Sequence, residues 1–193
     1  MRIGIFGGSF NPVHHGHLKL AERAVEELNL DRVIFVPSSQ TPLKTEALFP
    51  ASLRVKLLRI ALKKYPRFSV SPCEIQRGGL SFTIDTLKFF KRKFGKTTTL
   101  YFLAGADTLK RLSQWKSPGT VLALSRFVVM TRPGSLLGPT KSPAGVSFLA
   151  LDALPISSSD IRKRLSQGKT VSRWMPREAA AALSRYLKQQ KEK

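Results

Sequence analysis

The chain has 193 residues, and 42% of them are apolar, which suffices for a domain with its own hydrophobic core. Basic side chains outnumber acidic ones by 33 to 12, and the net charge of +21 favours anionic partners such as nucleotides, nucleic acids and acidic membranes. The single cysteine, Cys73, excludes an internal disulfide and a four-ligand thiolate zinc site; without a signal peptide or about 18 consecutive apolar residues, we expect a cytoplasmic protein.

The first third of the chain opens with a βαβ unit. Residues 3–6 form an apolar run that predicts a buried strand over 2–6, and residues 33–36 predict a second strand closed by Pro37. Between them, apolar residues at helical spacing predict an amphipathic helix over 15–28. Because the crossover of such a unit is right-handed, we expect the two strands to be parallel.

The loop between this strand and helix, residues 7–17, reads GGSFNPVHHGH and holds all three histidines of the chain. A strand that leads through glycines into a helix exposes backbone N–H groups and the positive end of the helix dipole, which suits a phosphate. His14 and His17 are three residues apart, so both rings fall near one face of the helix start. The alternatives are a plain glycine turn with surface histidines, or histidines that bind a metal.

The rest of the chain alternates between short apolar runs and helical patterns. Ser81 and Thr83 occupy positions expected of a helix cap, and Gly95 is expected to end that helix. Ser117 followed by Pro118 predicts another helix start. The predicted strands are 68–71, 98–103, 127–130 and 146–151, the predicted helices are 51–64, 83–94, 118–124, one from about 157 and one from 176, and 133–145 is predicted to be an irregular loop.

Five or six strands alternating with helices predict an α/β fold with a doubly wound, mainly parallel sheet and helices on both faces. Loops 7–17, 38–44, 104–107 and 156–158 all follow predicted strands. On a parallel sheet these loops emerge at one edge, so we expect them to form one site. Asp107 suits either a ribose hydroxyl or the N-cap of the next helix, and both interpretations stay open.

A second donor-rich helix start follows the last strand. Three serines, Ser157, Ser158 and Ser159, precede a helical pattern, and Arg162 lies one turn into it. Capping alone requires only one serine. The cluster therefore suggests a second phosphate cradle as the alternative to a simple cap.

The candidate residues are rich in hydrogen-bond donors and poor in acids and bases. The chain has no G-x-S-x-G turn, no P-loop and no G-x-G-x-x-G fingerprint, and Cys73 has no histidine near it in sequence. Such a set suits transfer of a nucleotidyl group to a phosphate that is already ionised, with catalysis by positioning and charge stabilisation. We expect Mg²⁺ on the triphosphate, held mainly by phosphate oxygens and water.

Two motifs carry a resemblance that covers almost the whole chain. GGSFNP followed by HHGH resembles the signature GG-x-F-x-P-x-H-x-GH of the HxGH nucleotidyltransferases, and ISSSDIR at 156–162 resembles their second signature, I-S-S-T-x-I-R, with Ser159 in place of threonine. Within that superfamily the chain resembles the bacterial nicotinate-mononucleotide adenylyltransferases, through residues 37–44, 81–87 and 105–107 and Trp115.

The resemblance implies a Rossmann-like nucleotidyltransferase fold and the reaction of ATP with nicotinate mononucleotide to give nicotinate adenine dinucleotide and pyrophosphate, a step of NAD biosynthesis. It implies that His14 and His17 hold and polarise the ATP phosphates. Lys44, Thr83 and Trp115 would bind nicotinate mononucleotide, with Trp115 stacked on the pyridine ring. The ATP-binding residues would be Gly8, Ser9, Phe10, Gly105, Asp107, Ile156, Ser157, Ser158 and Arg162.

The resemblance also implies one domain over residues 1–193, in which the helical part 156–193 completes the ATP site. Two rival interpretations are the same chemistry on a phosphopantetheine acceptor, and a nucleic-acid-binding protein suggested by the charge. We expect ATP and nicotinate mononucleotide as partners, without a membrane and without nucleic acid. A homo-oligomer, the strictness of nicotinate over nicotinamide, and the roles of His15 and Arg132 stay open.

Overall fold

A six-stranded sheet with the order β3-β2-β1-β4-β5-β6 forms the centre of the protein, and each neighbouring pair is parallel. The computed structural model describes residues 1–42, 47–105, 108, 111–131, 144–150 and 154–192. The predicted doubly wound, parallel α/β fold is confirmed. The strands are β1 (Arg2–Gly8), β2 (Arg32–Pro37), β3 (Phe68–Val70), β4 (Thr99–Gly105), β5 (Arg126–Thr131) and β6 (Val146–Ala150).

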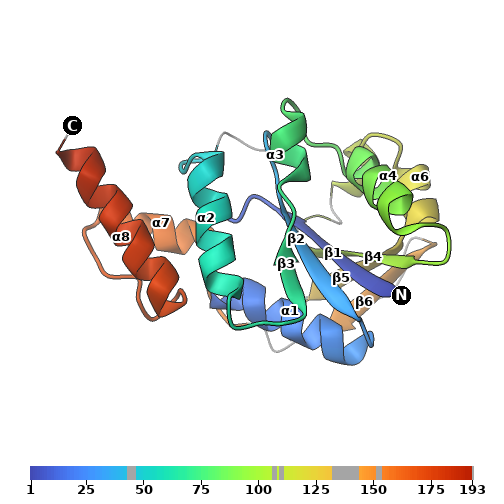
Figure 1. Ribbon diagram of the computed structural model, residues 1–193, viewed down its shortest axis with the longest axis horizontal. Coiled ribbons are helices and arrows are strands. Elements are labelled where there is room, and N and C mark those ends of the chain that lie inside the picture. The colour runs from blue at the N-terminus through green and yellow to red at the C-terminus, as the bar shows by residue number, and fades with distance from the viewer. Residues whose placement is uncertain (43–46, 106–107, 109–110, 132–143, 151–153, 193) are drawn as a thin grey trace.

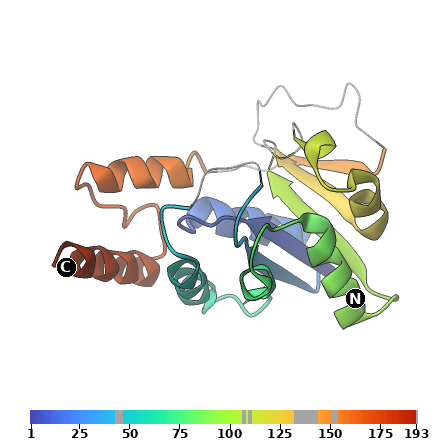
Figure 2. The same ribbon diagram turned by 90° about the horizontal axis from the view of Figure 1, so that it is seen from above.

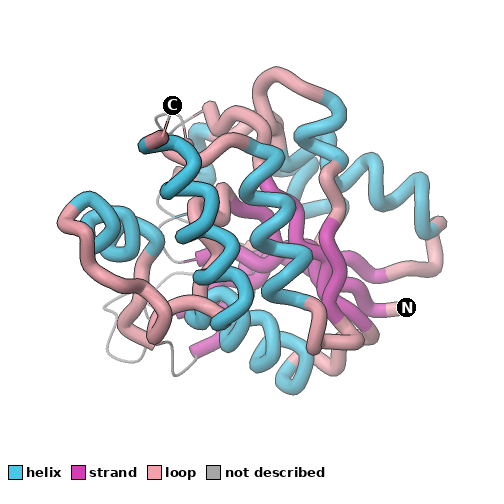
Figure 3. Tube along the Cα trace, turned by 60° about the vertical axis from the view of Figure 1, so that its left-hand side comes forward, coloured by secondary structure: helices cyan, strands magenta, loops and turns pink. Residues whose placement is uncertain are grey.

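Helices cover both faces of this sheet, as Figures 1 and 3 show. Each predicted helix is present with bounds close to those predicted, whereas α3 and η1 were not predicted. The helical elements are α1 (His15–Glu27), α2 (Ala51–Leu62), α3 (Cys73–Arg77), α4 (Thr83–Phe94), the 3₁₀ turn η1 (Leu112–Gln114), α6 (Pro118–Leu124), α7 (Ser158–Ser166) and α8 (Arg177–Lys191).

The two faces of the sheet are packed by alternating strand residues. Ile3 and Ile5 point into a core shared with α4 and α6, whereas Phe6 and Phe35 point into a core shared with α1 and α2. Successive side chains of a strand face opposite sides, and a parallel sheet buries both of them. This explains why the four inner strands β1, β2, β4 and β5 read as largely apolar runs in the sequence, whereas the edge strands β3 and β6 each contain an exposed serine.

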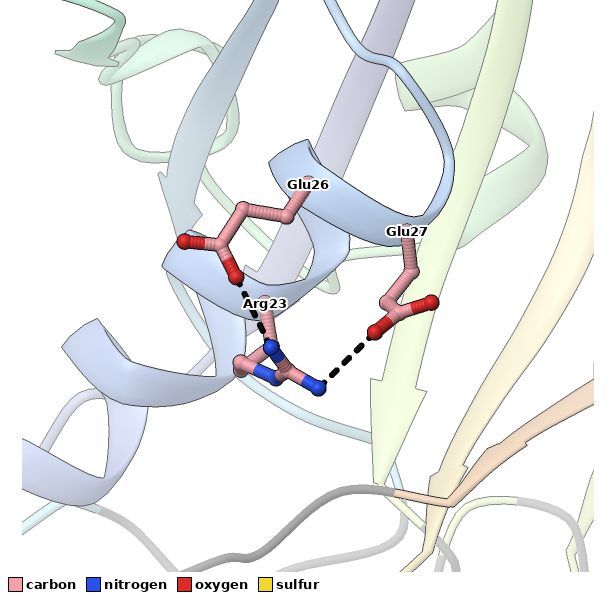
Figure 4. Close-up of polar contacts among 3 residues, drawn as sticks. All are labelled: Arg23, Glu26 and Glu27. Atoms are coloured by element: carbon pink, nitrogen blue, oxygen red, sulfur yellow. Dashed lines mark hydrogen bonds and ion pairs between the residues drawn. The ribbon is translucent and has the colours of Figure 1, made fainter.

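The first helix, α1, is held by its apolar stripe and carries its charges outside. Leu18 and Ala21 are buried against the sheet. On the outer surface Arg23 pairs with Glu26 at 3.0 Å and Glu27 at 2.8 Å (Figure 4). Exposed pairs at these helical spacings stabilise by about 0.2–0.5 kcal/mol each, so burial of the stripe dominates.

The C-terminal helices α7 and α8 lie on the side of the molecule away from α4 and α6 (Figures 1 and 2). Met175, Ala179 and Leu183 are fully buried in the core that also contains residues of α1 and α2. Residues 156–192 are therefore packed onto the sheet domain through an apolar interface. Among the described residues, no helix is long and apolar enough to cross a membrane.

The structure differs from the sequence-based expectation at three places. The single-turn helix α3 was not predicted, because five residues between Pro72 and Gly78 are too short to show a helical period. The predicted cap at Ser81 and Thr83 is wrong: Phe82 is the N-cap of α4, without a side-chain cap. Pro118 does begin α6, but Ser117 before it has a φ of 51° and makes no capping hydrogen bond.

Candidate active site

The loop between β1 and α1 brings two imidazole rings together. His14 is the N-cap of α1, and His17 follows three residues later. The ring centroids are 3.7 Å apart, with an interplanar angle of 31°. The prediction that both rings share one face of the helix start is confirmed.

A backbone hydrogen bond orients the second ring. The N–H of His14 donates to Nδ1 of His17 over 3.2 Å. Because Nδ1 accepts this bond, the proton of a neutral His17 ring lies on Nε2. Burial and the neighbouring His14 lower the pKa of His17 well below its ordinary value, so the ring is neutral at pH 7. His17 therefore suits a donor toward an anionic oxygen through Nε2–H, and not a general base.

Gly16 lies between His14 and His17 in the sequence, at a position that has no room for a side chain. A Cβ there would lie 3.0 Å from Nδ1 and 3.1 Å from Cε1 of His14. It would also lie 3.5 Å from the carbonyl oxygen of Ile156, the first residue of the second motif. The glycine thus lets the His14 ring and the chain before α7 approach the same turn of α1.

Phe10 holds the glycine-rich loop against the core through its buried ring. Its side chain is 1% exposed and packs edge-on against Phe6 at 5.5 Å and His17 at 5.0 Å between ring centroids. Its backbone has a φ of 44°, in the left-handed region that bulky residues rarely adopt. Such strain persists only where surrounding contacts enforce it, and it is typical of ligand-binding turns. The buried ring supplies those contacts for the turn that contains Gly8 and Ser9.

The second helix start is capped by one serine, as a simple cap requires. Ser157 is the N-cap of α7, and its Oγ accepts from the backbone N–H of Asp160 over 3.1 Å. Its hydroxyl also donates to the Asp160 carboxylate over 2.6 Å. The remaining serines of the cluster are thereby left for other contacts.

Two of those contacts join α7 to the glycine-rich loop. Ser158 Oγ donates to the carbonyl oxygen of Pro12 over 2.9 Å, between residues 146 apart in the chain. Arg162 Nη1 donates to the carbonyl oxygen of Asn11, also over 2.9 Å. The two motifs therefore form one surface around His14, with the N-termini of α1 and α7 side by side.

A cavity of about 400 Å³ opens at the carboxyl ends of β1 and β4, where the strand order reverses. The residues that line it include Gly8 and Ser9 at the end of β1, Thr83 at the start of α4, and Trp115. Trp115 stands edge-on to Phe102, with ring centroids 5.7 Å apart at 86°. Four of the predicted residues thus share this cavity, and the loop 7–17 connects it to the histidine pair.

The cavity wall also carries charged groups that the sequence reasoning missed. Lys116 Nζ lies 4.7 Å from the centroid of the Phe82 ring and 3.9 Å from the carboxylate of Asp85. Glu74 is buried, accepts a hydrogen bond from Thr86 over 2.5 Å, and has its pKa raised by desolvation. A charged residue next to Trp115 was a signal for Lys116, whereas Glu74 lies in the helix that the sequence pattern did not show.

A buried arginine was also missed. Arg54 of α2 is 2% exposed and donates to three backbone carbonyl groups. Its position gave a usable signal, because it stands three and four residues before Leu57 and Leu58. It therefore belongs to the buried stripe of α2, where a charged side chain is rare.

Some predicted residues lie elsewhere. Lys44 and Asp107 fall outside the described residues, as does Arg132. Gly105 ends β4 at an exposed position but does not line the cavity. The remaining predicted residues gather in the two places described above, the cavity and the paired helix starts.

Comparison with known proteins groups the chain with nucleotidyltransferases. The cytidylyltransferase-like family matches residues 5–164. A Clostridium novyi protein named "Probable nicotinate-nucleotide adenylyltransferase" is 38% identical over 192 residues, covering 94% of this chain and 96% of its own length. A Thermus thermophilus protein of the same name is 41% identical over 177 residues, covering 92% and 93%.

Solved structures share the fold. The nicotinic acid mononucleotide adenylyltransferase of Plasmodium falciparum, complexed with NaAD, superposes with a TM-score of 0.81 over 96% of this chain and 95% of that chain, at 18% identity. A putative nicotinate-nucleotide adenylyltransferase from Vibrio parahaemolyticus gives a TM-score of 0.71 over 94% and 97%, at 20% identity. With the family match and the near full-length relatives, this chain belongs to the cytidylyltransferase-like family, in the group of the nicotinate-nucleotide adenylyltransferases.

Proposed function

We propose that this protein transfers the adenylyl group of ATP to nicotinate mononucleotide, giving nicotinate adenine dinucleotide and pyrophosphate. The observation that carries the proposal is the contact between the two donor-rich helix starts, made by Ser158 and Arg162 on the backbone beside His14. Its location next to a cavity of about 400 Å³ provides room for an acceptor nucleotide. The names of the relatives support the same reaction.

In this reaction a phosphate oxygen of the mononucleotide attacks the α-phosphorus of ATP. A new P–O bond forms, the bond from the α-phosphorus to the oxygen bridging to the β-phosphate breaks, and the electron pair leaves with pyrophosphate. The attacking phosphate is ionised at pH 7, so no residue must remove a proton. Catalysis then depends on positioning and on donors that face the charge developing on phosphate oxygens.

The chain's own donors fit this requirement. Nε2–H of the neutral His17 ring is directed by the bond at Nδ1, and the ring lies in the first turn of α1, at the positive end of the helix dipole. Gly8 and Ser9 supply backbone N–H groups in the segment that leads from β1 toward this helix start. Arg162 adds a positive charge at the junction of the two helix starts. In this proposal residues 156–192 complete the ATP site of one domain, and His14 supports His17 and the phosphates.

Mg²⁺ would accompany the triphosphate. Among the described residues, no three histidine, cysteine, aspartate or glutamate side chains gather into a metal site. Phosphate oxygens and water are sufficient ligands for a hard cation that keeps part of its hydration shell. The ion would withdraw charge from the triphosphate oxygens while the residues of the site orient them.

The acceptor side fits a pyridine ring that bears a carboxylate. Trp115 provides an aromatic surface in the cavity, and Thr83 stands at the first turn of α4, where backbone N–H groups have no partner within the helix. Lys116 lies beside Phe82 in the wall of the same cavity. We therefore expect nicotinate mononucleotide to be preferred over its uncharged amide analogue, with Lys44 as a further ligand.

A pyrophosphate-release assay tests the proposal. The wild-type protein, with ATP and Mg²⁺, is expected to release pyrophosphate with nicotinate mononucleotide faster than with nicotinamide mononucleotide. His17→Ala should lower kcat by about 10²–10³, the usual effect of removing one preorganised donor. His15→Ala is the matched control, since the backbone bond of His15 to Trp174 survives the change. No turnover with either acceptor would refute the proposed reaction.

A further inference from the structure

Arg54 forms hydrogen bonds with three chain segments that meet behind the wall of the cavity. Its Nη1 donates to the carbonyl oxygen of Ser9 over 2.7 Å and its Nη2 to that of Ser38 over 2.8 Å. Its Nε donates to the carbonyl oxygen of Phe49 over 3.1 Å. Ser9 follows β1, Ser38 follows β2 and Phe49 precedes α2, so a single guanidinium links the loops at the edge of the sheet.

These bonds hold parts of the cavity wall. Ser9 and Ser38 both line the cavity, whereas Arg54 lies behind them. In a planar trans peptide the N–H points opposite to the C=O. Binding of the Ser9 carbonyl to Arg54 therefore turns the N–H of Phe10 away from the guanidinium. Arg54 sets the direction of a backbone donor within the phosphate-binding loop.

The same network extends to the acceptor side. The N–H of Ser39, in the peptide whose carbonyl binds Arg54, donates to Ser81 Oγ over 2.9 Å. Ser81 N–H in turn donates to the carbonyl oxygen of Gln40 over 2.8 Å. These bonds join the loop after β2 to the segment that leads into α4 and Thr83. Arg54 is thus connected to both substrate sides of the proposed site.

The charge of Arg54 is unusual for a buried group. None of the ion pairs among the described residues includes Arg54. Burial lowers the pKa of its guanidinium, yet arginine remains protonated because its ordinary pKa is so high. A buried charge without a counterion is unfavourable, and three carbonyl dipoles compensate it only in part. An anion bound on the other side of Ser9 and Ser38 would complete the compensation.

We propose that Arg54 is a positioning residue for adenylyl transfer, which orients the loops after β1 and β2 and supplies a buried countercharge for substrate phosphate. This inference rests on the proposed function. It assigns two separable tasks to one side chain: the forked geometry of the guanidinium positions the loops, and its charge strengthens anion binding. A lysine retains only the charge, and a glutamine retains neither the charge nor the fork.

Three variants test these tasks: Arg54→Lys, Arg54→Gln, and Arg59→Gln as the control. Arg59 is exposed on the same helix, so its replacement removes an equal charge without touching the loops. For each variant we would measure kcat, KM for both substrates, the free energy of unfolding, and the rise in Tm caused by inorganic pyrophosphate. The last readout reports anion binding without turnover, so it tests Arg54 even if the proposed reaction fails.

The expected results differ between the variants. Arg54→Gln should lose most of the pyrophosphate-induced rise in Tm and raise KM for the substrates about tenfold or more. Arg54→Lys should keep most of that rise but lose about ten- to a hundredfold in kcat, because loop geometry is lost. Arg59→Gln should match wild type. If both Arg54 variants keep wild-type kcat, KM and response to pyrophosphate, and lose only unfolding free energy, the proposal is overturned. If Arg54→Gln does not fold, the kcat of Arg54→Lys decides the outcome.

Discussion

Replacing Gly16 with alanine tests whether the active site requires two closely placed imidazoles at the start of α1. The added Cβ would lie 3.0 Å from Nδ1 and 3.1 Å from Cε1 of His14. Non-bonded heavy atoms prefer separations of about 3.5 Å or more, so the His14 ring must move by about 0.5 Å. Since the rings of His14 and His17 are in contact, the displacement reaches both.

The magnitude follows from two opposing effects on stability and one effect on rate. Overpacking in a close-packed site costs about 1–3 kcal/mol, whereas alanine in a helix is favoured over glycine by up to about 1 kcal/mol. The free energy of unfolding should therefore fall by about 0–3 kcal/mol. A 1 Å misplacement of catalytic groups can cost about 10² in rate, so a shift of half that size should lower kcat by about tenfold.

Gly119→Ala is the matched control for this change. Gly119 occupies the second position of α6, as Gly16 does in α1, but nothing lies within 4 Å of a Cβ built there. We expect it to leave kcat unchanged and to raise the free energy of unfolding slightly. Pyrophosphate release and urea denaturation of both variants provide the measurements. Wild-type kcat in Gly16→Ala would refute the reasoning that the histidine pair requires close packing.

Three further changes test the pKa shifts and the cap. In His17→Gln, the loss of Tm that wild type shows as pH falls below about 6.5 should become smaller, because the unfolded histidine takes up a proton that the buried ring resists; an equal loss in both proteins would contradict this. Glu74→Gln should raise the free energy of unfolding near neutral pH, since burial raises the pKa of Glu74 and so disfavours its charged form. Urea denaturation across pH should show this gain vanish below about pH 4.3, where the carboxyl group is protonated in both states, and a gain that persisted there would contradict the prediction. Ser157→Ala removes the cap of α7 and should cost about 1 kcal/mol in urea denaturation, so an unchanged midpoint would mean that the cap contributes nothing.

Most of the fold could be predicted because its signals are local. Apolar runs such as 33–36 predict buried strands without reference to other parts of the chain, and the observed β2 spans Arg32–Pro37. The periodicity of 15–28 likewise predicted α1. Helix α3 could not be found this way, since one turn carries no period. The cap of α4 could not either, because Ser81 bonds to Ser39, which is 42 residues away.

For the candidate site, too, local features could be predicted from the sequence and long-range contacts could not. Spacing alone placed the rings of His14 and His17 on one face, because helical geometry determines where residues three apart lie. Spacing could not show that Ser158 and Arg162 contact the loop beside them, since those bonds span 146 and 151 residues. It also could not show which ring nitrogen of His17 carries the proton, which depends on a single backbone bond.

The sequence by itself determined the six strands and the longer helices along the chain, the donor-rich starts of α1 and α7, and the family to which both motifs point. These follow from residues close in the chain, whose geometry is set by the backbone. Only the tertiary structure decided that Arg54 is buried among carbonyl groups and that Glu74 lies in the cavity wall. Burial of a charge depends on what distant segments place around it, and that arrangement exists only after the chain has folded.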